Sequence, residues 1–353
     1  MKKTLIAMAV LGAASGFAMA ASNVTLYGVI ETGVVVQKAK HEDTTVSMVS
    51  GFDQGSRWGI KGVEDLGNGY NVGFVLEQGF DSDSGADTAS NSAGRTFGRE
   101  AQMFVQGGFG KLGFGRFGTL SSGAGSYQIL TGWALGTGYG LSSWTSAIGT
   151  SFSRADNAIA YASPKFAGFS VHVAYSNGIA GDTNKWSENQ HYYGIGIKYD
   201  ENAIRSSLIF EALDGKGTAI AAKTAGDVLS LEEWALAVKD ETEITDALKA
   251  EYKEWAKTEI GEAKAAKKTA YAINYGLEWN LGSWTPMFAY QWAHQNGGKK
   301  THMFGLSASV KIGGGDALLG ARYLFGHDES ITKGTDKVRS WNLGAAYVQG
   351  ERM

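Results

Sequence analysis

Apolar and polar residues alternate along short segments over most of this chain, and glycine-rich or polar stretches separate the segments. The alternation is clearest in Ser56–Phe80, which predicts two strands of about ten residues joined by a Gly-Asn-Gly turn. On the first of these strands, Trp58 and Ile60 alternate with Arg57 and Lys61. One face is large and apolar and the other is charged, which is the pattern of a strand between lipid and water.

Strands of this kind recur to the end of the chain, with short and long connections in alternation. A transmembrane antiparallel β-barrel has this arrangement, with short turns at one end and long loops at the other. A soluble propeller or sandwich is the alternative, but a propeller needs a repeat of fixed period and none is visible. We therefore predict an all-β transmembrane barrel of fourteen strands: Val24–Val36, two strands in Ser56–Phe80, Arg95–Gln106, Lys111–Phe117, Asn157–Tyr161, Phe169–Tyr175, His191–Tyr199, Ile204–Leu213, Tyr271–Trp279, Pro286–Trp292, His302–Ile312, Ala317–Phe325 and Arg339–Gln349.

One insert, Asp214–Lys268, departs from the strand pattern. A capping box at Ser230–Glu233 predicts the start of a helix. A second helical run carries Leu248, Tyr252 and Trp255 on one face and charged residues on the other. The insert is expected to be a helical decoration of an extracellular loop, and the alternative is a lid or a ligand-binding cap.

The first twenty residues form a separate unit. Lys2 and Lys3 precede a short apolar run, and Ala18–Ala20 is a small-residue cleavage site before Ala21. The apolar run is too short to span a bilayer as a helix. We predict a signal peptide over residues 1–20 and a barrel domain over 21–353, and the alternative is a retained buried helix.

Composition narrows the function classes further. The formal net charge of −3 argues against a nucleic-acid surface. The chain has no cysteine, so its stability has another source than disulfides, and a closed hydrogen-bonded barrel is one such source. The two prolines are few, as expected for a chain made mainly of paired strands.

No motif in the chain predicts catalysis, a cofactor or a metal site. Gly113–Gly118 matches G-x-G-x-x-G, but no helix follows it and no βαβ unit surrounds it. The six histidines show no ligand spacing, so no zinc site is expected. The chain is therefore not expected to be an enzyme.

Several short motifs, in order along the chain, resemble the trimeric general porins of Gram-negative bacteria of the Neisseria and Comamonas type. They are Val24–Gly28, the Ser56–Phe80 hairpin, Gly98–Ala101, Arg154–Asn157 and Tyr161–Pro164. The resemblance implies a sixteen-stranded homotrimeric barrel in the outer membrane that lets small hydrophilic solutes diffuse passively. It also implies contact with outer-membrane lipid, lipopolysaccharide and the outer-membrane assembly machinery.

The resemblance further implies that the long connection 118–153 folds inward as a constriction loop. Porins of this family carry arginines on the wall opposite that loop, and Arg57, Arg99 and Arg154 match those positions. Lipid-facing arginine costs about 2–4 kcal/mol, so the water-filled side is favoured for them. Alternatively, each arginine is paired structurally with a wall carboxylate such as Glu31. Further candidates at the constriction are Lys61, Arg95, Arg116, Tyr127 and Trp133.

The loop departs from the family pattern because residues 118–153 contain no charged residue. A positive wall facing a neutral loop predicts a preference for anions. An alternative is a solute-selective channel in which Tyr127, Trp133 and Tyr139 stack on sugars or organic anions. A third, from another class, is an outer-membrane adhesin or enzyme that uses the helical insert.

The end of the chain is the second departure. Family members continue past the region of Trp341–Tyr347 with two more strands and finish on phenylalanine, whereas this sequence reads Gln349–Met353. Fourteen strands is an even number, so a smaller closed barrel is one possibility. A chain that lacks its last hairpin is the other, and is the one we expect.

Overall fold

The computed structural model describes residues 23–37, 43–87, 94–136, 154–179, 185–214, 235, 243, 245–260, 269–295, 298–328 and 337–349. The predicted signal peptide, the predicted helix that starts at Ser230, and Tyr139 lie outside these ranges.

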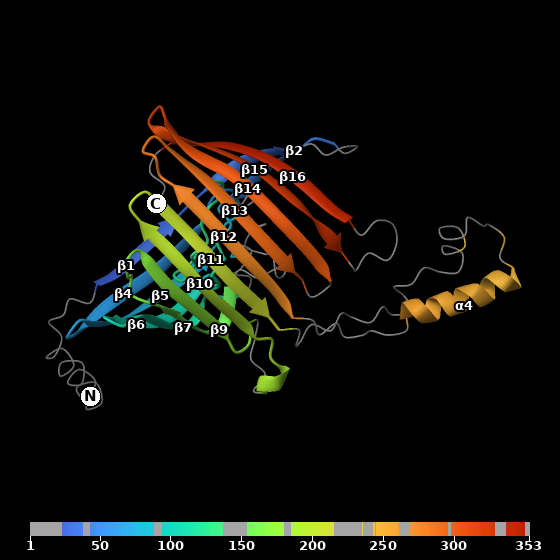
Figure 1. The fold of residues 1–353 in the computed structure, drawn as a ribbon, viewed down its shortest axis with the longest axis horizontal. Coiled ribbons are helices and arrows are strands. Elements are labelled where there is room, and N and C mark those ends of the chain that lie inside the picture. The colour runs from blue at the N-terminus through green and yellow to red at the C-terminus, as the bar shows by residue number, and fades with distance from the viewer. Residues whose placement is uncertain are drawn as a thin grey trace, which may run out of the picture.

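Within the described ranges, fourteen strands form one antiparallel sheet, which agrees with the predicted count and confirms the all-β fold class. Each strand pairs with its neighbours in chain order, and the sheet curls so that β4–β7 lie behind β10–β15 (Figure 1). The strands are β1 (Asn23–Val29), β4 (Arg57–Gly67), β5 (Tyr70–Gly79), β6 (Glu100–Gly107), β7 (Gly110–Gly118), β8 (Arg154–Ala162), β9 (Phe169–Ser176), β10 (Tyr192–Glu201), β11 (Ile204–Leu213), β12 (Ala270–Trp279), β13 (Trp284–His294), β14 (Lys299–Ile312), β15 (Gly315–Asp328) and β16 (Lys337–Gln349).

The first predicted strand is interrupted, which the alternation did not reveal. Its second half is β2 (Thr32–Gln37), which pairs with β3 (Thr45–Ser50) in a separate two-stranded sheet. At the break, the Ser56 hydroxyl accepts the Glu31 N–H at 3.0 Å, and Gly51 donates to the Glu31 carbonyl at 3.1 Å. These bonds replace the ladder bonds that a continuous strand would make.

The convex face of the sheet is apolar. Val171 and Val173 on β9 and Ile195 and Ile197 on β10 are all exposed, which identifies this face as the one that meets lipid. Exposed aromatic residues also gather beside the short turns, as in the interfacial belts of membrane barrels. They are Tyr70, Phe109, Phe166, Phe169, Trp279, Trp284 and Tyr347.

The concave face carries small and polar side chains between those apolar positions. Gln102, Glu211, Asn274 and Ser307 are all buried there. Successive residues of a strand thus face opposite sides of the sheet, as the sequence predicts, and the polar residues face the interior.

Short connections lie at one end of the sheet, and each has between two and six residues. In the β4–β5 turn, Gly67, Asn68 and Gly69 all have positive φ, a conformation that glycine and asparagine tolerate best. The long connections 80–99, 119–153 and 214–269 lie at the other end. Within the described ranges, no helix is long and apolar enough to cross a bilayer.

The insert contains helix α4 (Asp246–Ile260), in agreement with the second predicted helical run. The Thr245 hydroxyl accepts the Leu248 N–H at 3.2 Å and so caps its first turn. In Figure 1 this helix is drawn apart from the sheet.

β1 and β16 are the two ends of the strand order. Among the described residues no ladder joins them, so closure of a fourteen-stranded barrel by this pair stays the alternative that the sequence analysis left open.

Candidate functional site

The three predicted arginines meet at the long-loop ends of β4, β6 and β8, and we call Arg57, Arg99 and Arg154 the arginine cluster. Arg99 Nε lies 2.6 Å from Glu77 Oε1, and Arg57 Nε lies 3.6 Å from Glu77 Oε2. One carboxylate on β5 therefore serves two arginines. The Tyr27 hydroxyl donates to the same carboxylate at 3.0 Å and fixes its position further.

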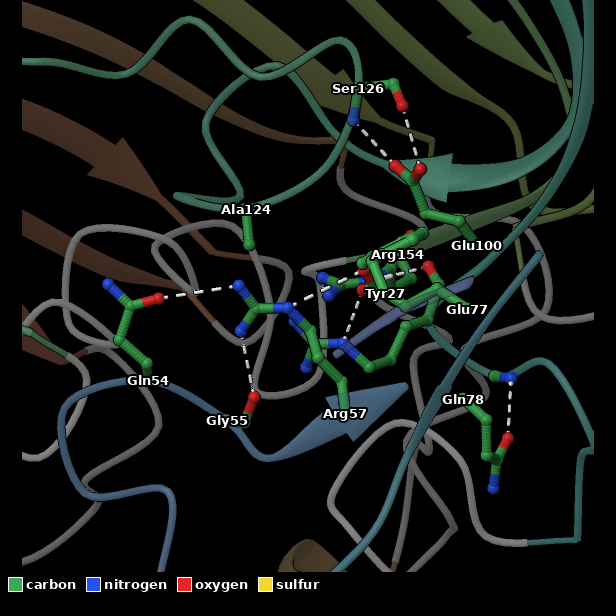
Figure 2. A network of polar contacts seen from close by, with 12 residues as sticks. Tyr27, Gln54, Gly55, Arg57, Glu77, Gln78, Glu100, Ala124, Ser126 and Arg154 are labelled. Atoms are coloured by element: carbon green, nitrogen blue, oxygen red, sulfur yellow. Dashed lines mark hydrogen bonds and ion pairs between the residues drawn. The ribbon is translucent and has the colours of Figure 1, made fainter. Parts of the chain in front are cut away.

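Arg154 joins the cluster through the backbone, because its Nε donates to the Arg99 carbonyl at 2.8 Å. Arg154 is buried, whereas Arg57 is only partly buried. The neighbouring Glu100 on β6 accepts both the N–H and the hydroxyl of Ser126, at 2.6 and 2.8 Å (Figure 2). Three cations and two carboxylates thus share this region.

Glu31 has a different role from the one considered in the sequence. Its two oxygens accept the backbone N–H groups of Asp53 and Gln54, at 2.7 and 2.6 Å. Arg57 in turn donates to the Gly55 carbonyl at 2.9 Å and to the Gln54 amide at 3.4 Å (Figure 2). Glu31 therefore shapes the turn beside Arg57, and Glu77 is the carboxylate that pairs with the arginines.

The remaining cationic candidates lie around the cluster. Lys61 is exposed, with its Nζ 5.2 Å from the centre of the Tyr27 ring. Arg95 and Arg116 both bind Asp156, and the Arg95 contact is 2.8 Å long. Arg95 and Arg116 therefore form an ion-paired group of their own and do not contact Glu77 in the described contacts.

The described part of the predicted constriction loop, residues 119–136, runs along the concave face of the sheet, and we call it the inward segment. Three wall carboxylates accept its hydrogen bonds: Glu100, Glu211 and Glu278. Glu211 accepts the Ser121 N–H at 3.2 Å, and Glu278 accepts the Gly132 N–H at 3.2 Å and the Thr131 hydroxyl.

Two neutral wall hydroxyls hold the inward segment as well. Tyr192 accepts the Leu120 N–H at 3.2 Å and donates to Glu211 at 2.7 Å, and Ser307 accepts the Ala134 N–H at 3.0 Å. A segment without charged residues is thereby held by charged groups of the wall, because a carboxylate is a strong acceptor for backbone N–H groups.

Glycines in the wall make this close approach possible. A Cβ at Gly276 would lie 2.0 Å from the Thr131 carbonyl oxygen, and one at Gly113 would lie 1.9 Å from the Tyr127 hydroxyl oxygen. Any side chain at these positions would push the inward segment off the wall.

Tyr127 differs from the expectation that it faces a solute. It is 1 % exposed and packs against Phe117 with ring centres 4.8 Å apart. Burial raises the pKa of its phenol, and Glu100 adds to the rise. The ring can lie against the wall because Gly113 has no side chain. Tyr127 therefore anchors the inward segment and is not available to stack on a solute. Trp133 is only partly buried and lines a cavity on the concave face.

Four groups that the sequence analysis missed are central to this site: Glu77, Glu100, Glu211 and Glu278. Each is a carboxylate at a position whose side chain faces the concave side of the sheet. Their place in the alternation of each strand was the one feature of the sequence that could have identified them. Within the described ranges, no group of three His, Cys, Asp or Glu residues is arranged to hold a metal ion.

Comparison with known proteins identifies the relatives of this chain. A family profile described as Gram-negative porin matches residues 7–353. An outer membrane porin protein of Bordetella pertussis is 28 % identical over all of this chain and 92 % of its own length. Outer membrane porin protein 32 of Delftia acidovorans is 34 % identical over 59 % of each chain.

Solved structures agree on the fold. An anion-selective porin from Comamonas acidovorans superposes with a TM-score of 0.60 at 23 % identity, over 92 % of this chain and 83 % of that one. The chain therefore belongs to the Gram-negative porin family and is a porin of the outer membrane.

Proposed function

We propose that this porin forms a water-filled channel through which small hydrophilic solutes diffuse passively, with a preference for anions. The observation that carries the preference is the arginine cluster beside an inward segment that has no charged residue. Arg57 and Arg99 share Glu77 as an ion-paired carboxylate, and Arg154 donates to the Arg99 carbonyl.

Two further observations support the preference. The three arginines outnumber the two carboxylates beside them, Glu77 and Glu100, and Glu100 also accepts two hydrogen bonds from Ser126. Cations on a narrow water-filled wall raise the local concentration of anions. The chain also has the same fold as a solved porin that is described as anion-selective, so this fold is compatible with an anion-preferring channel.

The test is the chloride-to-potassium permeability ratio of purified protein in planar bilayers. The double variant Arg57→Gln/Arg99→Gln is expected to lower this ratio, because it removes two positive charges from the narrow region. Lys165→Gln is the control, since it removes a positive charge from an exposed short turn. An unchanged ratio in the double variant would contradict the anion preference, and the absence of conductance steps would contradict the channel.

We also propose a homotrimer. A solved structure of the outer membrane protein OmpT of Vibrio cholerae, similar in fold, is described as a trimer form. A trimer-sized band that dissociates on heating, and insertion in three equal conductance steps, are the expected results. Single-step insertion would contradict it.

A further inference from the structure

A cavity of about 330 Å³ lies on the concave face near the short-turn end of β11–β15. The inward segment contributes Trp133 to its lining, and the wall contributes Arg205, Glu278, Thr285, Met287 and Leu318. No member of the arginine cluster lines it. We call it the Trp133 cavity.

One side of the Trp133 cavity is apolar. Trp133 and Met287 both pack on the buried group of Ala134, Leu135 and Leu318. A flat aromatic ring with aliphatic neighbours is a surface that binds the apolar body of a small solute.

The other side carries one accessible charge. Arg205 Nη1 lies 3.0 Å from Glu278 Oε2, and the Arg205 side chain is 54 % exposed whereas that of Glu278 is 13 % exposed. The second Glu278 oxygen accepts Gly132 and Thr131 of the inward segment. Both carboxylate oxygens are therefore engaged, and the arginine is the charged group that a solute reaches.

The positive charge of Arg205 favours a ligand with a negative charge. A guanidinium has five N–H donors in a planar fork that matches a carboxylate. The described contacts of Arg205 are one bond to Glu278 and a longer approach of its Nε, at 3.9 Å, to Asp200 Oδ2. A carboxylate that binds Arg205 keeps its apolar part within reach of Trp133 and Met287.

We propose that the Trp133 cavity binds small organic anions that combine one carboxylate with an apolar or aromatic body. The carboxylate binds Arg205, and the body lies against Trp133, Met287 and Leu318. This proposal rests on the proposed channel function, because the solute reaches the cavity through the water-filled interior. It adds a second station for anions, close to the short turns, beyond the arginine cluster.

The test uses the full chain in planar bilayers, with phenylacetate as the probe. Acetate lacks the ring, and 2-phenylethylammonium keeps the ring but carries the opposite charge. We expect phenylacetate to reduce the single-channel current in a saturable way, and the two comparison ions to have little effect at the same concentration.

Two variants examine the two sides of the cavity. Arg205→Gln is expected to weaken the apparent affinity for phenylacetate about tenfold, the size of one well-placed ionic contact. Thr285→Phe fills the cavity and is expected to abolish saturable block. The matched control is Arg322→Gln, because Arg322 lies on the same face of β15 as Leu318 but does not line the cavity. Its affinity is expected to equal that of the unmodified protein.

Equal affinity in the unmodified protein and in Arg205→Gln overturns the proposal. An equal loss of affinity for phenylacetate in Arg322→Gln also overturns it, because the loss then comes from removing any positive charge of the interior and not from the cavity. The permeability ratio is measured on the same channels: anion preference without phenylacetate block contradicts only the cavity, and block without anion preference contradicts only the proposed selectivity.

Discussion

The two sides of the interior use carboxylates in different ways. On β5, Glu77 lies between Arg57 and Arg99 and reduces a concentration of positive charge. On β11 and β12, Glu211 and Glu278 accept N–H and hydroxyl groups of a neutral segment, and Glu278 also pairs with Arg205. Glu77 thus pairs with two arginines on one wall, whereas most partners of Glu211 and Glu278 on the other wall are backbone and hydroxyl groups of a loop. Counting charged residues in the interior does not distinguish these roles.

The largest expected effect concerns the loop-bearing wall. Glu211→Ala leaves the Tyr192 hydroxyl and the Ser121 N–H without their buried acceptor, so we expect the free energy of unfolding to fall by about 2–4 kcal/mol. The measurement is the urea or temperature midpoint at which the folded band disappears on a gel. Glu211→Gln keeps a carbonyl acceptor and should lie close to the unmodified protein. Equal losses of unfolding free energy in both variants would show that the charge of Glu211, and not its hydrogen bonds, stabilises the folded protein.

The next effect concerns the fit between wall and loop. Gly276→Val places a side chain where the Thr131 carbonyl lies, at a cost of about 1–3 kcal/mol if the inward segment stays in place. We expect the segment to move into the interior and the single-channel conductance to fall. Gly108→Ala is the control, since a Cβ there meets nothing within 4 Å. Unchanged conductance in Gly276→Val would mean that the segment is not what narrows the channel.

A matched pair of substitutions tests the comparison directly. Glu77→Gln removes a negative charge beside the path of the ion, which is worth about 0.4 kcal/mol for an ion about 10 Å away in water, so anion preference should rise about twofold. Glu278→Gln makes the same chemical change away from the arginine cluster, beside Arg205, and weakens the hold on Thr131 and Gly132. Its permeability ratio should change less, and its open-channel current noise should increase. The same response in both variants would remove the distinction between the two walls.

The smallest effect is expected for Lys61→Gln. Lys61 is exposed and its described contact is with the Tyr27 ring, so its charge is screened by salt. The permeability ratio should fall slightly at about 0.01 M salt and stay constant at about 1 M, where the Debye length is only about 3 Å. A large change at high salt would place Lys61 in the narrow region itself.

Alternation along the chain was sufficient to predict most of the strands and their faces, and the family resemblance predicted the gathering of three arginines. Residues of one strand face the same side at every second position, so Arg57 and Lys61 could be assigned together. The break at Glu31 was not predictable in this way, because it depends on side-chain bonds from Ser56, 25 residues away.

The partners of the inward segment were also beyond sequence reasoning. Glu278 is 146 residues from Gly132, and no local pattern connects them. Tyr127 was a candidate at the constriction, and in the alternative of a solute-selective channel it was expected to stack on solutes. Its burial depends on the absence of a side chain at Gly113, which only the packed structure reveals.

The belt of aromatic residues beside the short turns has an electrical consequence. It fixes the depth of the barrel in the bilayer, and Arg57 lies ten residues along β4 from Gly67, whereas Arg205 directly follows the first residue of β11. With a rise of about 3.3 Å per residue and a tilt of about 40°, the offset of nine residues separates the two arginines by about 23 Å along the channel axis, close to the height of the apolar band. An anion at one station therefore experiences a different fraction of the applied voltage from an anion at the other. Reversing the voltage should change how long an organic anion dwells in the channel, so the current it blocks will depend on the side to which it is added.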